Sequence, residues 1–181
     1  DVQARYIEVE CCPPTVTCPT VNPSYPTDIG YCYATLSLPA TSTNYCNNDV
    51  ITYYVGTNQI SFPYQFPIGR TTVRAVVTYG SQTDECSFDV VVVDEEDPVI
   101  TCPPDADYEG CSTDILGTAT TLSFSTNITL TSLTALQDAG GNAYDNCTIQ
   151  SVTYQDVATG ICPIEVTRTF VVTDMAGNVG S

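Results

Sequence analysis

One junction occurs twice in the sequence, and it constrains the fold more than any other feature. Residues 90–103 read Val-Val-Val-Val-Asp-Glu-Glu-Asp-Pro-Val-Ile-Thr-Cys-Pro, typical of a strand, an acidic hinge and a second strand that ends in Cys-Pro. Residues 6–19 follow the same scheme, as Tyr-Ile-Glu-Val-Glu-Cys-Cys-Pro-Pro-Thr-Val-Thr-Cys-Pro. The later copy closes one β domain and opens another. The earlier copy opens a domain, but its leading strand follows no domain in this sequence.

The rest of the chain has the pattern of short strands separated by turns. Thr, Val and Tyr favour strands, and the runs that contain them are bounded by Pro, Gly, Asn and Asp. We expect strands at 15–18, 31–38, 50–55, 60–67, 71–79, 87–93, 99–102, 148–155 and 164–172, with an alternating Thr/Ser-rich tract at 119–133. This pattern predicts an all-β protein built from β-sandwiches.

An internal repeat divides the chain into a short strand and two domains. Residues 14–19 match residues 98–103 at an offset of 84, and Val76-Val77-Thr78 matches Val171-Val172-Thr173. We therefore expect an N-terminal strand at 1–10, a first domain at 11–97 and a second at 98–181. A full closing strand, 86–93, follows Thr78, whereas only eight residues follow Thr173. The second domain is thus expected to lack its last strand.

The two junctions agree in length if the missing strand comes from another copy of the chain. Thr78 and Pro98 are 20 residues apart, and the path from Thr173 through the C-terminus to Pro14 of a following copy is 22. Residues 1–10 then stand in the place of the closing strand, with apolar side chains at Val2, Ala4, Tyr6, Ile7 and Val9.

An open sandwich exposes unpaired backbone groups, which a strand donated by a neighbour would satisfy. Repeated head to tail, such a contact makes a fibre. We therefore predict a homopolymer of separate subunits or of covalent tandem repeats. The alternative is that residues 1–10 fold back on their own first domain.

Cysteine content and charge restrict the location and the class of function. The chain has ten cysteines, no histidine and a net charge of −17, and its four basic residues are all arginine. Without histidine the cysteines predict disulfides rather than zinc, and hence an extracellular or cell-surface protein. The charge argues against nucleic acid and anionic membranes as partners, and no apolar run could span a membrane. The absence of His and Lys argues against an enzyme.

Four motifs resemble those of the hyalin-repeat (HYR) family. They are residues 97–103 (Asp-Pro-Val-Ile-Thr-Cys-Pro), 66–73 (Phe-Pro-Ile-Gly-Arg-Thr-Thr-Val), 86–92 (Cys-Ser-Phe-Asp-Val-Val-Val) and 174–178 (Asp-Met-Ala-Gly-Asn). The resemblance implies tandem immunoglobulin-like β-sandwiches of extracellular adhesins and surface filaments. The second domain departs from the pattern, because Cys162-Pro163-Ile164 stands where the family has Phe-Pro-x-Gly and its last strand is missing.

The resemblance also implies a disulfide pattern. Cys18 on the opening strand would bond Cys86 on the closing strand. Pairs at matching places, Cys32–Cys46 and Cys111–Cys147, would each close a local loop. Cys102 lacks its usual partner, so Cys162 is the available candidate. This leaves Cys11 and Cys12 to form a vicinal bridge or to bond a neighbouring unit.

The acidic hinge is either a solvated linker or a calcium site. In the second interpretation Asp94, Glu95, Glu96 and Asp97 supply oxygen ligands to Ca²⁺, together with loop carboxylates such as Asp145 or Asp174. Asn127 and Asn146 fit the acceptor pattern for N-glycosylation. Two functions follow: the subunit of an extracellular filament joined by strand donation, or an adhesin module that binds surface glycans or proteins.

Overall fold

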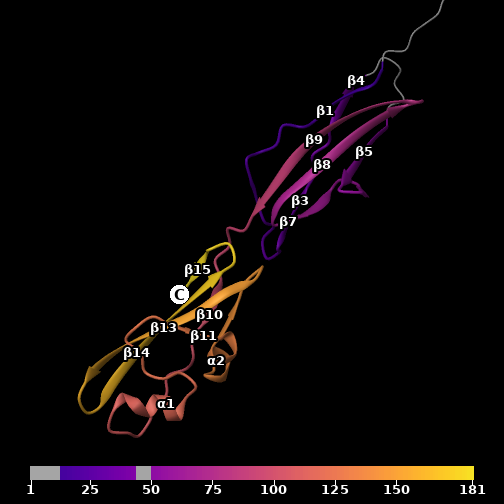
Figure 1. Ribbon diagram of the computed structural model, residues 1–181. Coiled ribbons are helices and arrows are strands. Elements are labelled where there is room, and N and C mark those ends of the chain that lie inside the picture. Colours follow the sequence, from indigo (N-terminus) through magenta and orange to yellow (C-terminus); the bar gives the residue numbers. More distant parts are fainter. Residues whose placement is uncertain (1–12, 44–49) are drawn as a thin grey trace, which may run out of the picture. The chain divides into compact units, whose positions relative to one another are not determined.

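The computed structural model describes residues 13–43 and 50–181, which fall into two compact units (Figure 1). Among the described residues the first unit comprises 13–28, 33–43 and 50–93. The second comprises Asp94–Ser181 together with the short segment Ile29–Cys32. Both units are built mainly from β-strands, as the sequence predicts, and the few helices are all short and belong to the second unit.

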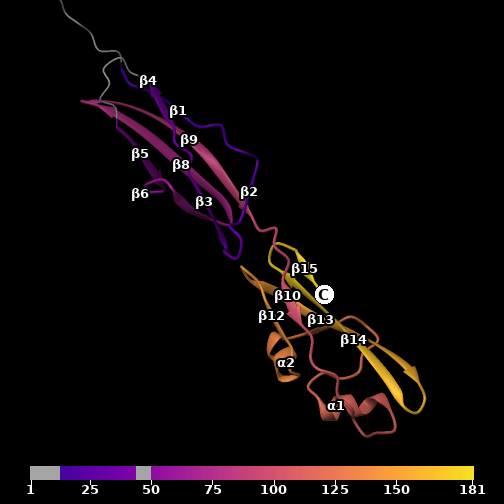
Figure 2. The ribbon, with the colours of Figure 1, turned by 180° about the vertical axis from the view of Figure 1, so that it is seen from behind.

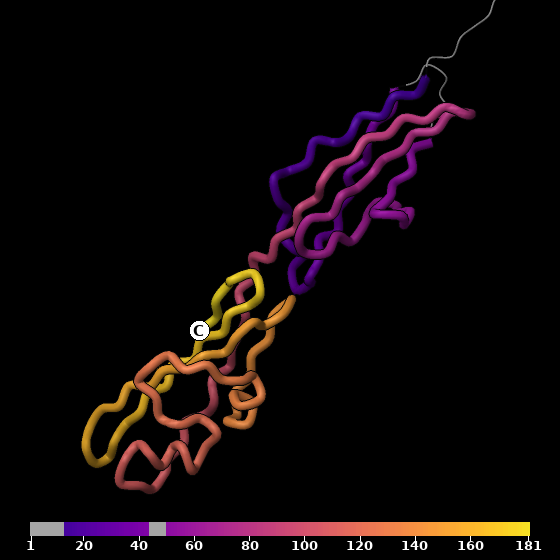
Figure 3. Tube along the Cα trace, in the orientation of Figure 1, coloured from indigo at the N-terminus to yellow at the C-terminus, as the bar shows by residue number. Residues whose placement is uncertain are grey.

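The first unit is built around a long hairpin. Its strands are β1 (Thr15–Thr17), β2 (Tyr25–Pro26), β3 (Tyr33–Leu36), β4 (Thr41–Thr43), β5 (Val50–Val55), β6 (Asn58–Ile60), β7 (Tyr64–Pro67), β8 (Gly69–Tyr79) and β9 (Gln82–Val93). Five of them form a sheet in the order β2-β9-β8-β5-β6, while β1 pairs with β4 and β3 pairs with β7. Figure 3 shows the long β8–β9 hairpin, in magenta and pink.

The core of the first unit lies between this sheet and the two small strand pairs. Alternate residues of β8 and β9, such as Val73 and Val90, are fully buried. They pack with Phe66 of β7, and other residues of the sheet pack with Val16 of β1. A buried residue at every second position is what a sheet with one covered face requires. The first unit therefore has two layers.

The second unit contains a similar long hairpin with fewer strands around it. Its elements are β10 (Val99–Thr101), the 3₁₀ turn η1 (Thr113–Ile115), α1 (Leu116–Ala119), β11 (Thr129–Thr131), α2 (Leu133–Asp138), β12 (Asn142–Tyr144), β13 (Ile149–Gly160), β14 (Ile164–Asp174) and β15 (Val179–Gly180). The main sheet has the order β11-β13-β14-β15, and β10 pairs with β12. Figure 2 shows this unit from behind, with α2 close to β12.

The tract at 119–133 forms a strand only at Thr129–Thr131, and a helix follows it. The Ser132 side chain caps α2 by accepting a hydrogen bond from the Ala135 backbone N–H at 3.0 Å. Leu136 on this helix is fully buried in the core with Val152 and Phe170. Helix spacing lets α2 bury Leu136 and partly bury Leu133, which an extended strand would place on opposite faces.

The repeat found in the sequence is also a repeat in strand register. Ile51 of β5 faces Val77 of β8, and Val152 of β13 faces Val172 of β14. A side-chain hydrogen bond recurs as well: Thr52 Oγ1 donates to Val76 O at 3.3 Å, and Thr153 Oγ1 donates to Val171 O at 3.4 Å. β13 and β14 therefore correspond to β5 and β8, residue for residue around these pairs.

Candidate functional site

The sheet of the second unit has an open edge along β14. In the first unit β8 pairs with β5 on one side and with β9 on the other, from Gly69↔Val92 to Tyr79↔Gln82. The equivalent strand β14 pairs with β13 on one side, but on the other β15 covers only Val172 and Thr173. Among residues 13–43 and 50–181 no strand pairs with this side of Ile164–Val171.

The open edge of β14 presents unpaired backbone groups beside the apolar face of the sheet. Phe170 and Val172 are buried in the core, whereas Thr167 and Thr169, on the opposite face, are exposed. At the hairpin end of the strand Ile161 is 91 % exposed and Ile164 is 37 % exposed. A strand added here could pair its backbone with β14 and cover the apolar face with alternate side chains. We call Ile164–Val171 the acceptor edge.

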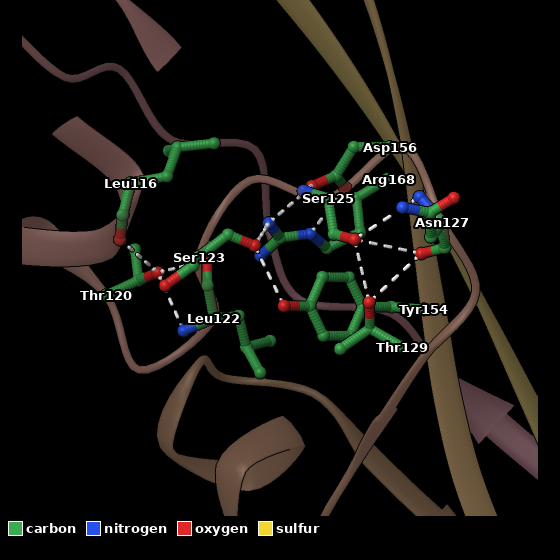
Figure 4. Close-up of polar contacts among 10 residues, drawn as sticks. All are labelled: Leu116, Thr120, Leu122, Ser123, Ser125, Asn127, Thr129, Tyr154, Asp156 and Arg168. Atoms are coloured by element: carbon green, nitrogen blue, oxygen red, sulfur yellow. Dashed lines mark hydrogen bonds and ion pairs between the residues drawn. The ribbon is translucent and has the colours of Figure 1, made fainter. Parts of the chain in front are cut away.

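A buried ion pair lies on the acceptor edge (Figure 4). Arg168 of β14 faces Asp156 of β13, at the position where Val73 faces Val55 in the first unit. Arg168 Nε lies 2.7 Å from Asp156 Oδ1 and Nη2 lies 2.8 Å from Oδ2. The Ser125 backbone N–H donates to the same carboxylate at 2.9 Å.

The arginine also rests on an aromatic ring. Its guanidinium lies 4.5 Å from the centroid of the Tyr154 ring, and both residues donate hydrogen bonds to Ser123 O. Both carboxylate oxygens of Asp156, and Nε and Nη2 of Arg168, therefore have hydrogen-bond partners, as burial of charge requires. The sequence held a signal that we did not use, since Asp156 and Arg168 interrupt apolar positions of two matched strands.

An acidic cluster lies elsewhere in the second unit. Asp94 is 6 % exposed and Asp174, at the end of β14, is fully buried. Ligand atoms of Asp94, Asp145 and Cys147 all lie within 4.8 Å of one another. The Cys147 sulfur belongs to a disulfide, so carboxylate oxygens are the ligands this cluster can offer. Asp145 Oδ2 accepts a hydrogen bond from the Cys147 N–H at 2.9 Å, whereas its Oδ1 is buried without a hydrogen-bond partner among the described residues.

Burial raises the pKa of the Asp145 carboxyl, and the nearby charges of Asp94 and Asp174 raise it further. Negative charges gathered at short range repel one another, and a bound cation would relieve that repulsion. Carboxylate oxygens suit a hard divalent cation such as Ca²⁺. The structure thus brings together Asp94 and Asp145, two of the residues that the sequence proposed as calcium ligands, with the charge of Asp174 close enough to act on Asp145.

The motif at 174–178 builds the turn that ends β14. Asp174 Oδ1 accepts hydrogen bonds from the N–H groups of Gly177 at 2.6 Å and Asn178 at 2.8 Å. Gly177 has a φ of +97°, which favours glycine. The Asn178 side chain donates to Asp174 Oδ2 at 2.8 Å and to the Asp94 carbonyl at 3.2 Å. Asp174 is therefore held by its own turn. Asn178, which the sequence analysis identified only as part of the 174–178 motif, ties that turn to Asp94.

The other hinge residues do not join the cluster. Glu95 and Asp97 are exposed. The Glu96 carboxylate accepts from the Gly30 N–H, at 2.9 Å from Oε1 and 3.2 Å from Oε2. Glu96 and Asp97 instead line a hollow with Tyr144 and Asp145.

One expected disulfide is present and the others need correction. Cys18 bonds Cys86, the pairing that the resemblance implies. Cys32 bonds Cys147, so the expected pairs Cys32–Cys46 and Cys111–Cys147 are wrong. The reason is that Cys32 belongs to segment 29–32, which is part of the second unit.

The expected Cys102–Cys162 bond is also absent, and Cys102, Cys111 and Cys162 are exposed and form no disulfide with another described residue. Cys102 follows β10, which pairs with β12, whereas Cys162 lies in the turn between β13 and β14. Three further cysteines, Cys11, Cys12 and Cys46, lie outside the described residues, as do the donor-strand residues Val2, Ala4, Tyr6, Ile7 and Val9.

The two glycosylation motifs differ in their surroundings. Asn127 is exposed. Asn146 is half-buried, and its side-chain amide donates to Tyr31 O at 3.1 Å and to Asp94 Oδ1 at 3.0 Å. A glycan on Asn146 would replace a proton of an amide that these contacts use, so only Asn127 is suited to modification.

Comparison with known proteins gives no relative. No model of a known protein family matches the chain, and a search of curated proteins finds no match. Within the described part of the chain, no helix has the length and apolar composition needed to cross a membrane.

Proposed function

We propose that the chain is the structural subunit of an extracellular filament, in which residues 1–10 of one copy add a strand to β14 of the adjacent copy. The observation that carries the proposal is the acceptor edge. β8 has a strand along both sides, whereas its equivalent β14 lacks one along Ile164–Val171 in the part of the chain that the structure describes.

The register of the first unit indicates how the donated strand would sit. Residues 86, 88 and 90 of β9 face Ala75, Val73 and Thr71 of β8. The matching positions of β14 are Phe170, Arg168 and Val166, and the matching donor residues are Val2, Ala4 and Tyr6. Alternate apolar side chains would then cover the core face of β14. Along β14, the donated strand would begin one position beyond the residue that pairs with Gly180, the last residue of β15.

The remaining features fit this function. Both units are proposed to be immunoglobulin-like sandwiches, with the donated strand completing the second. Two disulfides, Cys18–Cys86 and Cys32–Cys147, fit an oxidising extracellular setting. In the second unit Ca²⁺ would bind at Asp94 and Asp145 and offset the repulsion around Asp174.

Deletion of residues 1–10 tests the proposal. The truncated chain should stay monomeric by light scattering and form no filaments in electron micrographs, while the full chain assembles. A peptide of residues 1–10 should bind the truncated chain, one peptide per chain, and a scrambled peptide of the same composition should not. A full-length chain that stays monomeric at high concentration would contradict the proposal and favour an adhesin module.

A further inference from the structure

The turn that leads into β11 presents an acceptor motif for N-linked glycans. Asn127, Ile128 and Thr129 form the motif, and Asn127 is exposed. Thr129 Oγ1 lies 3.0 Å from Asn127 O and 2.7 Å from Ser125 Oγ (Figure 4), and the Asn127 backbone N–H donates to Ser125 Oγ at 3.3 Å. These contacts fix the main chain of the turn. They leave the Asn127 side-chain amide without a hydrogen bond to any described residue.

The other acceptor motif of the chain gives an internal contrast. Asn146 is half-buried, and its amide nitrogen already donates to Tyr31 O and to Asp94 Oδ1. The next residue, Cys147, is bonded to Cys32. The structure therefore separates two motifs that the sequence alone treats alike, and only Asn127 has a side chain that is both exposed and available.

The strand that follows Asn127 is an open edge of its own. β11 stands at one end of the sheet order β11-β13-β14-β15, and in the described part of the chain it pairs only with β13. Ile128 is 73 % exposed and Leu130 is 72 % exposed. Such an edge invites pairing with a second chain, which proteins commonly prevent with charged side chains or with a cover.

Charge does not protect this edge. Although the chain has a net charge of −17, residues 115–137, which include β11, contain no charged residue. The edge therefore has exposed apolar side chains, an unpaired side and no charge in its own segment. A cover attached next to β11 would supply the missing protection, and Asn127 lies two residues before Thr129, where the strand begins.

We propose that Asn127 carries an N-linked glycan, which covers the open edge of β11. In the modification the Asn127 amide nitrogen bonds the anomeric carbon of a lipid-linked oligosaccharide donor, loses one proton and displaces the phosphorylated lipid. A glycan is bulky and solubilising, so it keeps a second chain away from Ile128 and Leu130. The inference is independent of strand donation, which uses β14 on the other side of β13.

Mass spectrometry of the protein from its natural source tests the site. The peptide that contains Asn127 should carry a sugar, and the peptide that contains Asn146 should not. A peptide N-glycosidase should convert residue 127 to Asp and lower the mass of the chain to about 19.4 kDa. An unmodified Asn127, or a glycan on Asn146 in its place, would overturn the proposal.

Variants of the full chain, secreted from a cell line that N-glycosylates its secreted proteins, test the motif. Asn127→Gln should remove the glycan, whereas Asn146→Gln, the matched control, should keep it. Thr129→Ala should also remove it, and Thr129→Ser, which retains the hydroxyl that the motif requires, should keep it. A glycan that persists in Asn127→Gln would contradict the assignment.

The same variant tests the cover. By light scattering and electron microscopy, Asn127→Gln should associate side by side at a lower concentration than the glycosylated wild type. Leu130→Lys added to this variant should reverse the effect, because a charge blocks pairing of an edge strand. Val50→Lys, which places the same charge on an exposed residue of the first unit, should not. Head-to-tail contacts through β14 are common to all these proteins, so equal association with and without the glycan would overturn the cover.

Discussion

Arg168 on β14 faces Asp156 on β13, and its guanidinium donates two hydrogen bonds to the Asp156 carboxylate. Asp156 is only 1 % exposed. The first unit places Val73 and Val55 at the same positions. Beside its open edge, then, the second unit holds a desolvated ion pair where the first holds two aliphatic side chains. Burial makes each partner dependent on the other, because an unpaired charge at this position cannot reach bulk water.

Removal of one partner should be far more damaging than removal of both. Arg168→Met leaves the Asp156 carboxylate unpaired and should lower the free energy of unfolding by about 3–5 kcal/mol. The double variant Asp156→Val with Arg168→Val copies the first unit and should recover most of this loss. Denaturant unfolding of the full chain measures both. Arg70→Met, which breaks an exposed ion pair with Asp89, should have a much smaller effect, because solvent screens an exposed pair. Equal losses in the single and double variants would contradict the interpretation.

The Cys18–Cys86 disulfide should stabilise the first unit strongly. It closes a loop of 68 residues, and restriction of the unfolded chain by a loop of this length contributes roughly 4 kcal/mol. Replacement of both cysteines by alanine should lower the unfolding temperature of the first unit. Calorimetry can resolve this transition, and the second unit, whose disulfide is Cys32–Cys147, should be unaffected.

The Asp145 carboxyl should make stability depend on pH and on calcium. Its pKa is raised in the folded chain, so the folded state holds this proton more tightly than the unfolded state does. The stabilisation that this proton provides is fully present below the pKa that Asp145 has in the unfolded chain. It is lost as pH rises through the pKa that Asp145 has in the folded chain. In chelator, Asp145→Asn should therefore stabilise the chain at neutral pH and leave it unchanged in acid.

Calcium should reverse the effect of Asp145→Asn on stability at neutral pH, because the bound ion favours the ionised carboxylate of the wild type. Added Ca²⁺ should raise the unfolding temperature of the wild type at neutral pH, and Asp145→Asn should lose most of that increase. Mg²⁺, which prefers a stricter geometry, should have a smaller effect. Glu95→Gln, at an exposed hinge residue outside the cluster, is the matched control and should respond to Ca²⁺ as the wild type does. An equal calcium response in all three proteins would show that the ion binds elsewhere.

The donated strand should tolerate charge on one face only. In the proposed register Tyr6 would lie opposite Val166 on the core face, whereas Ile7 would point to the other face of the sheet. Tyr6→Asp should raise the concentration needed for assembly by roughly 10- to 100-fold, since burial of a large apolar side chain contributes about 1.5–3 kcal/mol. Ile7→Asp should have a much smaller effect. Sedimentation of filaments across a concentration series measures both, and the reverse order would show that the register is shifted by one residue.

Local pattern was enough to predict much of the fold. The strand expected at 50–55 is β5, and the match of residues 76–78 with 171–173 proved to be a match in register. The alternation of apolar residues predicts strands and their register, because each inward-facing side chain must pack in the core. Pairings that depend on tertiary placement were not predictable. The Cys32–Cys147 bond joins residues 115 apart, and nothing local to Cys32 indicates that segment 29–32 belongs to the second unit.

The acidic cluster was only partly predictable for a similar reason. The chain places Asp94, Glu95, Glu96 and Asp97 in one run, and composition cannot tell which of them turns inward. The structure buries Asp94, pairs Glu96 with the Gly30 N–H and leaves Glu95 and Asp97 exposed. The partners of Asp94, Asn146 and Asn178, come from turns that lie 52 and 84 residues further along the chain.

The bare side of β14 gives any filament built on it a direction. Strand donation makes each contact heterologous, so one end of the polymer would present an uncovered Ile164–Val171 and the other an unused N-terminal strand. The two ends would differ in chemistry, in growth rate and in what can cap them. A short extended peptide would stop growth at the first end only. Before assembly the uncovered edge is also a site for misassociation, so newly made chains would need to meet one another quickly or be shielded.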